Sequence, residues 1–174
     1  MVSLKDHSQV QITDGQKRMD DPAWSPDGEW ILFLQSDERD IKQLYIMSAD
    51  GQMKRQLTHA SNIFSMPQSP VWAPNGSEIA YFKLNTLVIV DTIGTVIKSM
   101  SIPPPSSHSL RYLYHEPDML LFLFQGEEVT TSNLYKLSLS KQTAIIWKTK
   151  RPLLEVFHDI SRDGTQLVFC RPEG

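Results

Sequence analysis

The sequence predicts an all-β fold built from repeated, four-stranded antiparallel sheets. A short turn phrase recurs at intervals of roughly 40–50 residues, and its two clearest copies are Trp24–Gly28 and Trp72–Gly76. An apolar run typical of a β-strand follows each copy, at Ile31–Leu34 and Ile79–Phe82. Polar turns divide the rest of each repeat into further short strands. A repeat of this length, made of strands and turns, is the signature of a β-propeller.

The turn phrase has a structural explanation. In Ser25-Pro26-Asp27-Gly28 the proline presets φ, the aspartate accepts backbone hydrogen bonds and the glycine takes the left-handed conformation. The preceding Trp24 or Trp72 is expected to point into the gap between two blades, where large aromatic side chains fill the wedge between twisted sheets. A third copy lies at Ile160–Gly164, and a worn copy lies at Leu113–Pro117. The phrase therefore predicts folding and carries no catalytic residue.

The first repeat divides into four strands. They are expected near Pro22–Trp24, Trp30–Gln35, Gln43–Ser48 and Met53–Thr58. The last two strands are joined at Ala49-Asp50-Gly51, because Asp-Gly readily supplies the positive φ of a hairpin turn.

Two further repeats follow the same plan. The second has strands near Pro70–Trp72, Glu78–Leu84, Thr86–Asp91 and Thr95–Met100. The third has strands near Leu110–Tyr114, Met119–Gln125, Asn133–Leu139 and Thr143–Thr149. The proline-rich run Ile102–Ser107 between them is expected to be a stiff linker, because proline cannot donate a ladder hydrogen bond.

The two ends each supply part of a blade. Gln9–Thr13 aligns with an outer strand, and Leu167–Cys170 with the second strand of a blade. The predicted division is 1–18 (outer strands of a split blade), 19–62, 63–105 and 106–152 (whole blades) and 153–174 (inner strands of a split blade). Three arrangements fit: a four-bladed ring closed within one chain, an eight-bladed ring of two chains, or part of a larger propeller.

The repeat resembles that of the TolB-like family. The resemblance rests on Pro22–Gly28, Ile31–Phe33, Leu44–Gly51 and Arg55–Thr58, and it covers nearly all the chain, although the third repeat matches loosely. The same repeat occurs in propeller domains of prolyl-oligopeptidase-like peptidases, tricorn proteases and oligogalacturonate lyases. The resemblance implies a non-catalytic scaffold that binds a protein or ligand. The alternative is the propeller portion of a prolyl-oligopeptidase-like serine peptidase without its hydrolase domain.

The residues themselves show no catalytic or metal-binding set. There is no Gly-x-Ser-x-Gly nucleophile elbow, and the five histidines are scattered, whereas a lyase of this family would need a histidine-rich metal cluster. The single Cys170 lies in an apolar strand and is expected to be buried and inert. The acidic loop Ser36–Asp40 lacks the ligand spacing of a calcium loop. We expect no enzyme activity, no cofactor and no metal.

Polar residues that vary from blade to blade precede the innermost strands. They are expected to line the central channel or its mouth and to form the binding surface: Asp21, Gln68, Ser69, Arg111 and His158.

The net charge and the hydropathy pattern indicate which classes of binding partner to expect. The formal net charge of −3 does not favour nucleic acid, and no apolar stretch approaches the ~20 residues that span a bilayer. The expected partner is another protein or peptide, with a homodimer through open blade edges as an alternative. The first residues lack a basic region followed by an apolar run, which favours a cytoplasmic location, or a periplasmic one if the true N-terminus lies upstream.

Overall fold

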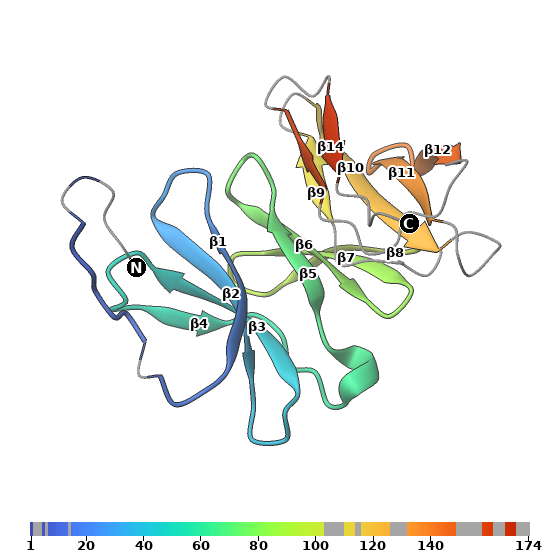
Figure 1. The fold of residues 1–174 in the computed structure, drawn as a ribbon. Helices are drawn as coiled ribbons and strands as arrows, with labels where there is room; N and C mark the ends of the chain where they lie inside the picture. The colour runs from blue at the N-terminus through green and yellow to red at the C-terminus, as the bar shows by residue number, and fades with distance from the viewer. Residues whose placement is uncertain are drawn as a thin grey trace, which may run out of the picture.

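The predicted first blade is present as a four-stranded antiparallel sheet. The structure is a computed structural model that describes residues 1, 5, 7–13, 15–102, 110–113, 116–125, 132–148, 158–161 and 166–169. The strands of this blade pair in sequence order (Figure 1): β1 (Met19–Trp24), β2 (Trp30–Ser36), β3 (Lys42–Ser48) and β4 (Lys54–Gln56).

The next two blades repeat this order. The second contains β5 (Gln68–Trp72), β6 (Glu78–Lys83), β7 (Thr86–Asp91) and β8 (Val96–Ser101). The third contains β9 (Arg111–Leu113), β10 (Glu116–Gln125), β11 (Ser132–Ser138) and β12 (Thr143–Lys148). A two-stranded sheet of β13 (His158–Ile160) and β14 (Leu167–Phe169) follows, and a short 3-10 turn, η1 (Ile63–Ser65), joins the first two blades. The predicted all-β architecture is confirmed.

The repeated turns work as predicted. Asp27 accepts a hydrogen bond from the Glu29 backbone N–H at 3.0 Å and another from the Ser25 hydroxyl, and Gly28 has φ +76°. The Ser48–Gly51 turn uses the same arrangement, because Asp50 accepts from the Gln52 N–H at 3.0 Å and Gly51 has φ +77°. One local solution therefore serves two different turns of the same blade.

Neighbouring blades pack through alternate residues of the middle strands. In β6 and β7, Ile79, Tyr81, Val88 and Val90 join the core shared with the first blade. The residues between them face the third blade, where Phe82 meets Phe122 edge to face with ring centroids 5.3 Å apart. A strand that is buried on both faces needs apolar residues at every position, which explains the unbroken apolar runs of the sequence.

The two repeat tryptophans differ. Trp72 is 5% exposed in the core between the first two blades, as predicted, and its indole N–H donates to the Ala23 carbonyl at 3.3 Å. The same prediction was wrong for Trp24, which is 50% exposed. Trp24 pairs with Ile31 on the blade face that points away from the second blade, and in the described chain no blade covers that face.

The N-terminal segment also departs from the expectation. Gln9–Thr13 was expected to form an outer strand, but within the described residues only Gln9 forms an isolated bridge. Met1 and Val10 exchange two backbone hydrogen bonds, so the segment folds back on itself instead of joining another blade. Ile12 packs on the outer face of the first blade. The expected linker residues 103–107 and Cys170 lie outside the described residues.

Candidate functional site

The innermost strands of the blades carry matching irregularities. β1 and β5 lie in contact, and β5 also contacts β9. The pairing of β1 with β2 shifts register between Asp20 and Ala23, and that of β5 with β6 shifts between Gln68 and Val71. At these bulges Asp21 has φ +53° and Ser69 has φ +49°, values that side-chain-bearing residues seldom adopt. Strained bulges of this kind commonly re-aim side chains at functional sites.

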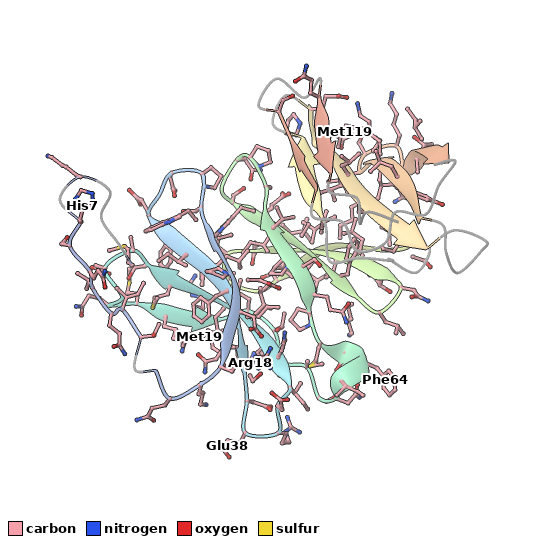
Figure 2. The ribbon with its side chains drawn as sticks, viewed as in Figure 1. His7, Arg18, Met19, Glu38, Phe64 and Met119 are labelled. Carbon is pink, nitrogen blue, oxygen red and sulfur yellow. The ribbon has the colours of Figure 1, made fainter. Side chains whose placement is uncertain are left out.

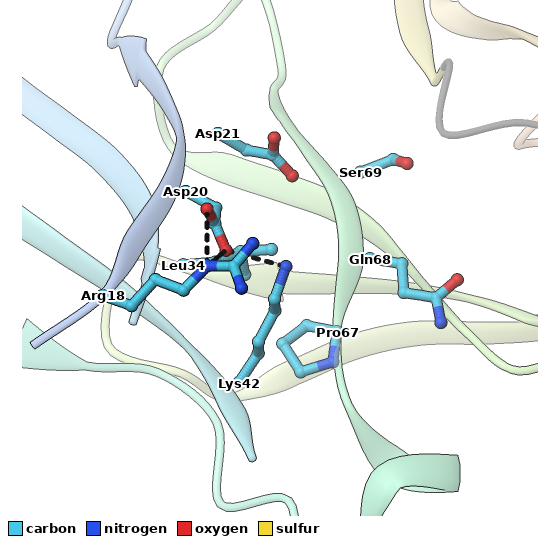
Figure 3. A pocket seen from close by; sticks show the side chains of 8 residues that line it. All are labelled: Arg18, Asp20, Asp21, Leu34, Lys42, Pro67, Gln68 and Ser69. Carbon is cyan, nitrogen blue, oxygen red and sulfur yellow. Dashed lines mark hydrogen bonds and ion pairs between the residues drawn. The ribbon is translucent and has the colours of Figure 1, made fainter. Parts of the chain in front are cut away.

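A polar pocket lies where the two bulged strands meet (Figure 3). We call it the inner-strand pocket; its volume is about 270 Å³. Both blades contribute to its lining: Arg18, Asp20, Asp21, Leu34 and Lys42 from the first and Pro67, Gln68 and Ser69 from the second. In the view of Figure 3, Gln68 and Ser69 project on the opposite side of β5 from Arg18, Asp20 and Lys42.

An ion cluster holds one side of this pocket. The Lys42 Nζ lies 2.8 Å from Asp20 Oδ2, and the Arg18 Nε lies 3.3 Å from the same oxygen. The hydrogen bond from Lys42 is the largest cause that lowers the pKa of Asp20 below its ordinary value, with the charge of Lys42 and the hydrogen bond from Arg18 adding to it. Asp20 is therefore ionised at neutral pH and occupied by two cations.

Three other polar groups in the pocket have no partner in the part of the chain that the structure describes. Among the described residues, none forms a hydrogen bond or ion pair with the side chains of Asp21 or Gln68. The Ser69 hydroxyl is buried without a hydrogen bond, although the residue is only 8% exposed. A buried hydroxyl without a partner costs free energy, so its persistence at a strained bulge is typical of a binding surface.

The structure brings together three of the five residues predicted for the channel mouth. Asp21, Gln68 and Ser69 line one pocket, but they lie inside the innermost strands and not before them, because the bulges let β1 and β5 begin earlier. Arg111 and His158 are the first residues of β9 and β13, the equivalent strands. Their side chains lie outside the described part of the chain, so a shared site for all five remains a prediction.

Sequence reasoning missed the three members of the ion cluster. Asp20 adjoins Asp21 and could have been found with it. Lys42 comes from the other end of the β2–β3 connection, and only the pairing of Ser36 with Lys42 brings it back toward β1. Arg18 precedes the strand and has no distinguishing local pattern.

The part of the chain that the structure describes contains no cluster of metal ligands and no membrane-spanning helix. No three His, Cys, Asp or Glu side chains there lie close enough to hold a metal ion. In the acidic loop, Asp37 accepts from the N–H groups of Arg39 and Ile41 and pairs with the Arg39 guanidinium at 2.9 Å, so it serves the turn. Among the described residues, no helix is long and apolar enough to cross a bilayer.

Comparison with known proteins agrees with this architecture. No family profile matches the sequence. The structure superposes on TolB from Acinetobacter baumannii with a TM-score of 0.76 and 17% identity, over 98% of this chain and 42% of TolB. The fold is that of a β-propeller. The propeller domain of the Trilobed protease from Pyrococcus furiosus superposes with a TM-score of 0.64 and 18% identity, over 99% of this chain and 54% of that one.

A curated relative is closer in sequence. A protein of Bacillus subtilis, described as the uncharacterized peptidase YuxL, is 43% identical over 79 residues. That match spans 45% of this propeller chain and 12% of YuxL. The chain thus spans a small share of YuxL and less than half of TolB.

Proposed function

We propose that this protein is a non-catalytic TolB-like propeller that binds a peptide segment at the inner-strand pocket. The supporting observation is that two polar groups line the same pocket: the Asp21 carboxylate, which pairs with no described residue, and the Ser69 hydroxyl, which is buried without a hydrogen bond. A carboxylate that pairs with no cation among the described residues favours a ligand with a positive charge. The free amino group of a peptide supplies that charge together with hydrogen-bond donors, and charge-assisted hydrogen bonds are the strong ones.

The ion cluster makes this pocket selective. Arg18 and Lys42 are both engaged by Asp20, which leaves Asp21 for a ligand. Because the cluster and the two bulges are already formed, little conformational entropy is lost on binding. The Gln68 amide offers both a donor and an acceptor to the peptide backbone.

Titration calorimetry with trialanine tests this proposal. We expect the 174-residue chain to bind trialanine, and N-acetyl-trialanine to bind at least about tenfold more weakly, because acetylation removes the charge. Asp21→Asn should weaken trialanine binding by a similar factor. Glu29→Gln is the matched control, since Glu29 is an exposed carboxylate in the turn between β1 and β2. Equal binding of both peptides, or an unchanged affinity in Asp21→Asn, would overturn the proposal.

A second function is favoured by the relative's description. The 43% identity with YuxL supports a role as the propeller portion of a prolyl-oligopeptidase-like peptidase. In that role the inner-strand pocket would hold substrate peptides on their way to a hydrolase domain. Catalysis would come from that domain, because this sequence has no Gly-x-Ser-x-Gly motif.

The reading frame beyond Gly174 separates the two functions. A downstream hydrolase domain with a nucleophile elbow, and hydrolysis of an aminoacyl p-nitroanilide by the longer protein, would support the peptidase. Asp21→Asn should then raise KM and leave kcat unchanged, because the pocket would bind substrate without touching the reacting bond. A stop codon followed by unrelated sequence would leave the binding scaffold.

A further inference from the structure

A second, chemically different groove lies on the second blade, beside the 3-10 turn η1 that joins this blade to the first. We call it the outer groove; its volume is about 360 Å³. Apolar side chains dominate its lining, which consists of Phe64, Tyr81, Lys83, Leu84, Thr86, Val88, Val96 and Ser99. It shares no lining residue with the inner-strand pocket.

The rim of the outer groove is apolar and unusually exposed. Phe64 is 68% exposed, and Leu84 and Val96 are each 57% exposed. Figure 2 shows Phe64 on the 3-10 turn, projecting away from the sheets. Single exposed apolar residues are common on protein surfaces, but several around one groove mark an interaction site.

The turn that carries Phe64 is held in place. The Asn62 side chain accepts hydrogen bonds from the N–H groups of Phe64 at 3.0 Å and Ser65 at 3.1 Å. The Ser65 hydroxyl accepts from the Asn62 N–H at 3.2 Å and completes the capping box. An exposed phenyl ring on a fixed turn loses little entropy when a partner covers it.

Two polar groups of the groove have no hydrogen-bond or ion-pair partner among the described residues. Tyr81 is 6% exposed at the buried base, where burial raises the pKa of its hydroxyl, and no described residue hydrogen-bonds with that hydroxyl. Lys83 is the one charged residue in the lining, is exposed, and has no ion-pair partner among the described residues. The groove thus combines an apolar wall with one hydroxyl and one cation that have no partner among the described residues.

We propose that the outer groove docks the carboxyl-terminal residue of a partner protein, with a large apolar side chain. A terminal residue places an apolar side chain and a carboxylate on the same Cα, which matches an apolar wall beside one cation. The side chain packs between Phe64 and Val96, the carboxylate pairs with Lys83, and the Tyr81 hydroxyl donates to the peptide. Such a complex is small, so its affinity as an isolated peptide is weak.

Peptide titration followed by ¹H–¹⁵N NMR tests this site. The probe is N-acetyl-Gly-Gly-Leu with a free carboxylate, which cannot use a free amino group at the inner-strand pocket. We expect shifts at the amides of Leu84, Val96 and Ser99, and at least fivefold weaker binding of the C-terminally amidated peptide. Lys83→Gln should weaken the free acid by a similar factor and abolish the difference between the two peptides.

Matched variants distinguish specific binding in the outer groove from non-specific binding to exposed apolar side chains. Phe64→Ser should weaken binding at least fivefold, while Ile63→Ser, which removes a neighbour that is 61% exposed but does not line the groove, should leave the affinity unchanged. Both side chains are exposed, so both variants are expected to fold. Equal binding of acid and amide, equal effects of the two serine variants, or no shifts at the groove would each overturn the proposal. The trialanine result does not bear on this outcome, because the sites share no residue.

Discussion

The two faces of the first blade have the same sequence pattern and opposite surroundings. On one face Leu32, Leu34, Leu44 and Ile46 pack against the second blade and are almost fully buried. On the other, Ile31, Phe33 and Met47 form a small cluster with Ile12, and Trp24 beside them is half exposed. Each face alternates along the same strands, so the difference comes from what covers it.

The covered and uncovered faces use different chemistry. The face toward the second blade packs on an apolar core that includes Trp72, and the Trp72 indole N–H and the Arg55 guanidinium each donate a hydrogen bond to a backbone carbonyl of the other blade. On the outer face, the Lys54 ammonium lies 4.9 Å from the centroid of the Tyr45 ring and 5.5 Å from that of Phe33. A cation over aromatic rings tolerates water, so it protects an open face better than exposed apolar side chains would.

Removing the tryptophan at the covered face should have the largest effect. Trp72→Ala leaves a cavity in the core between two blades and is expected to lower the free energy of unfolding by about 3–5 kcal/mol. Urea unfolding followed by circular dichroism measures this loss. A loss below that of Trp24→Ala would contradict the assignment of the two faces.

Substitution of a glycine at the same contact between blades should cause the second-largest loss of stability. Gly94 has φ +90°, and a Cβ there would lie 2.7 Å from the Leu57 carbonyl of the first blade. We expect Gly94→Ala to cost about 2–4 kcal/mol through backbone strain and steric overlap, measured by urea unfolding. Gly28→Ala is the control: its φ is +76° but nothing lies within 4 Å, so only the conformational cost of about 1 kcal/mol remains. Equal losses would show that the contact with Leu57 is not tight.

At the uncovered face the same substitution should have a small effect. Trp24→Ala is expected to cost less than about 1 kcal/mol, because the side chain is already half in water. It should also remove a red-shifted fluorescence component that acrylamide quenches readily. Should a larger loss or a blue-shifted component be observed, Trp24 must be covered in solution, and light scattering would show whether a second copy covers it.

Breaking the ion cluster of the inner-strand pocket should have the smallest effect on the free energy of unfolding. The folded-state pKa of Asp20 lies below its ordinary value of 3.8, so its stabilisation is present above that pH and is lost as the pH falls through the folded-state value. The side chain is 25% exposed, which limits the contribution to about 1 kcal/mol or less. The difference in urea midpoint between wild type and Asp20→Asn should shrink from pH 6 to pH 3. A constant difference would show that the pairing with Lys42 does not stabilise the fold.

Most of the architecture could be predicted because its signals are local. Strand alternation, the Asp-Gly turns and the recurring phrase depend on residues a few positions apart, and the strands of all three blades formed within a few residues of their expected bounds. The outer strand at Gln9–Thr13 could not be predicted in the same way. An outer strand forms only when a neighbouring strand accepts its hydrogen bonds, and that partner is not encoded in the segment itself.

The candidate sites were less predictable because they depend on register between distant residues. Asp21 and Ser69 stood out as polar residues near innermost strands, yet their left-handed φ follows from bulges that no local pattern marked. Lys42 reaches Asp20 only through the pairing of β1, β2 and β3. Phe64 and Val96 line one groove only because the 3-10 turn η1 lies beside the strands of the second blade.

The sequence by itself determined the four-stranded blade, its repeat and its turns, since hydrophobic alternation and turn chemistry act over a few residues. Only the tertiary structure decided which tryptophan is buried and which carboxylate is paired with cations. Burial and ion pairing depend on atoms that are close in space and can be far apart in the chain. The contact between the first two blades buries Trp72, and strand pairing within the first blade brings Lys42 to Asp20.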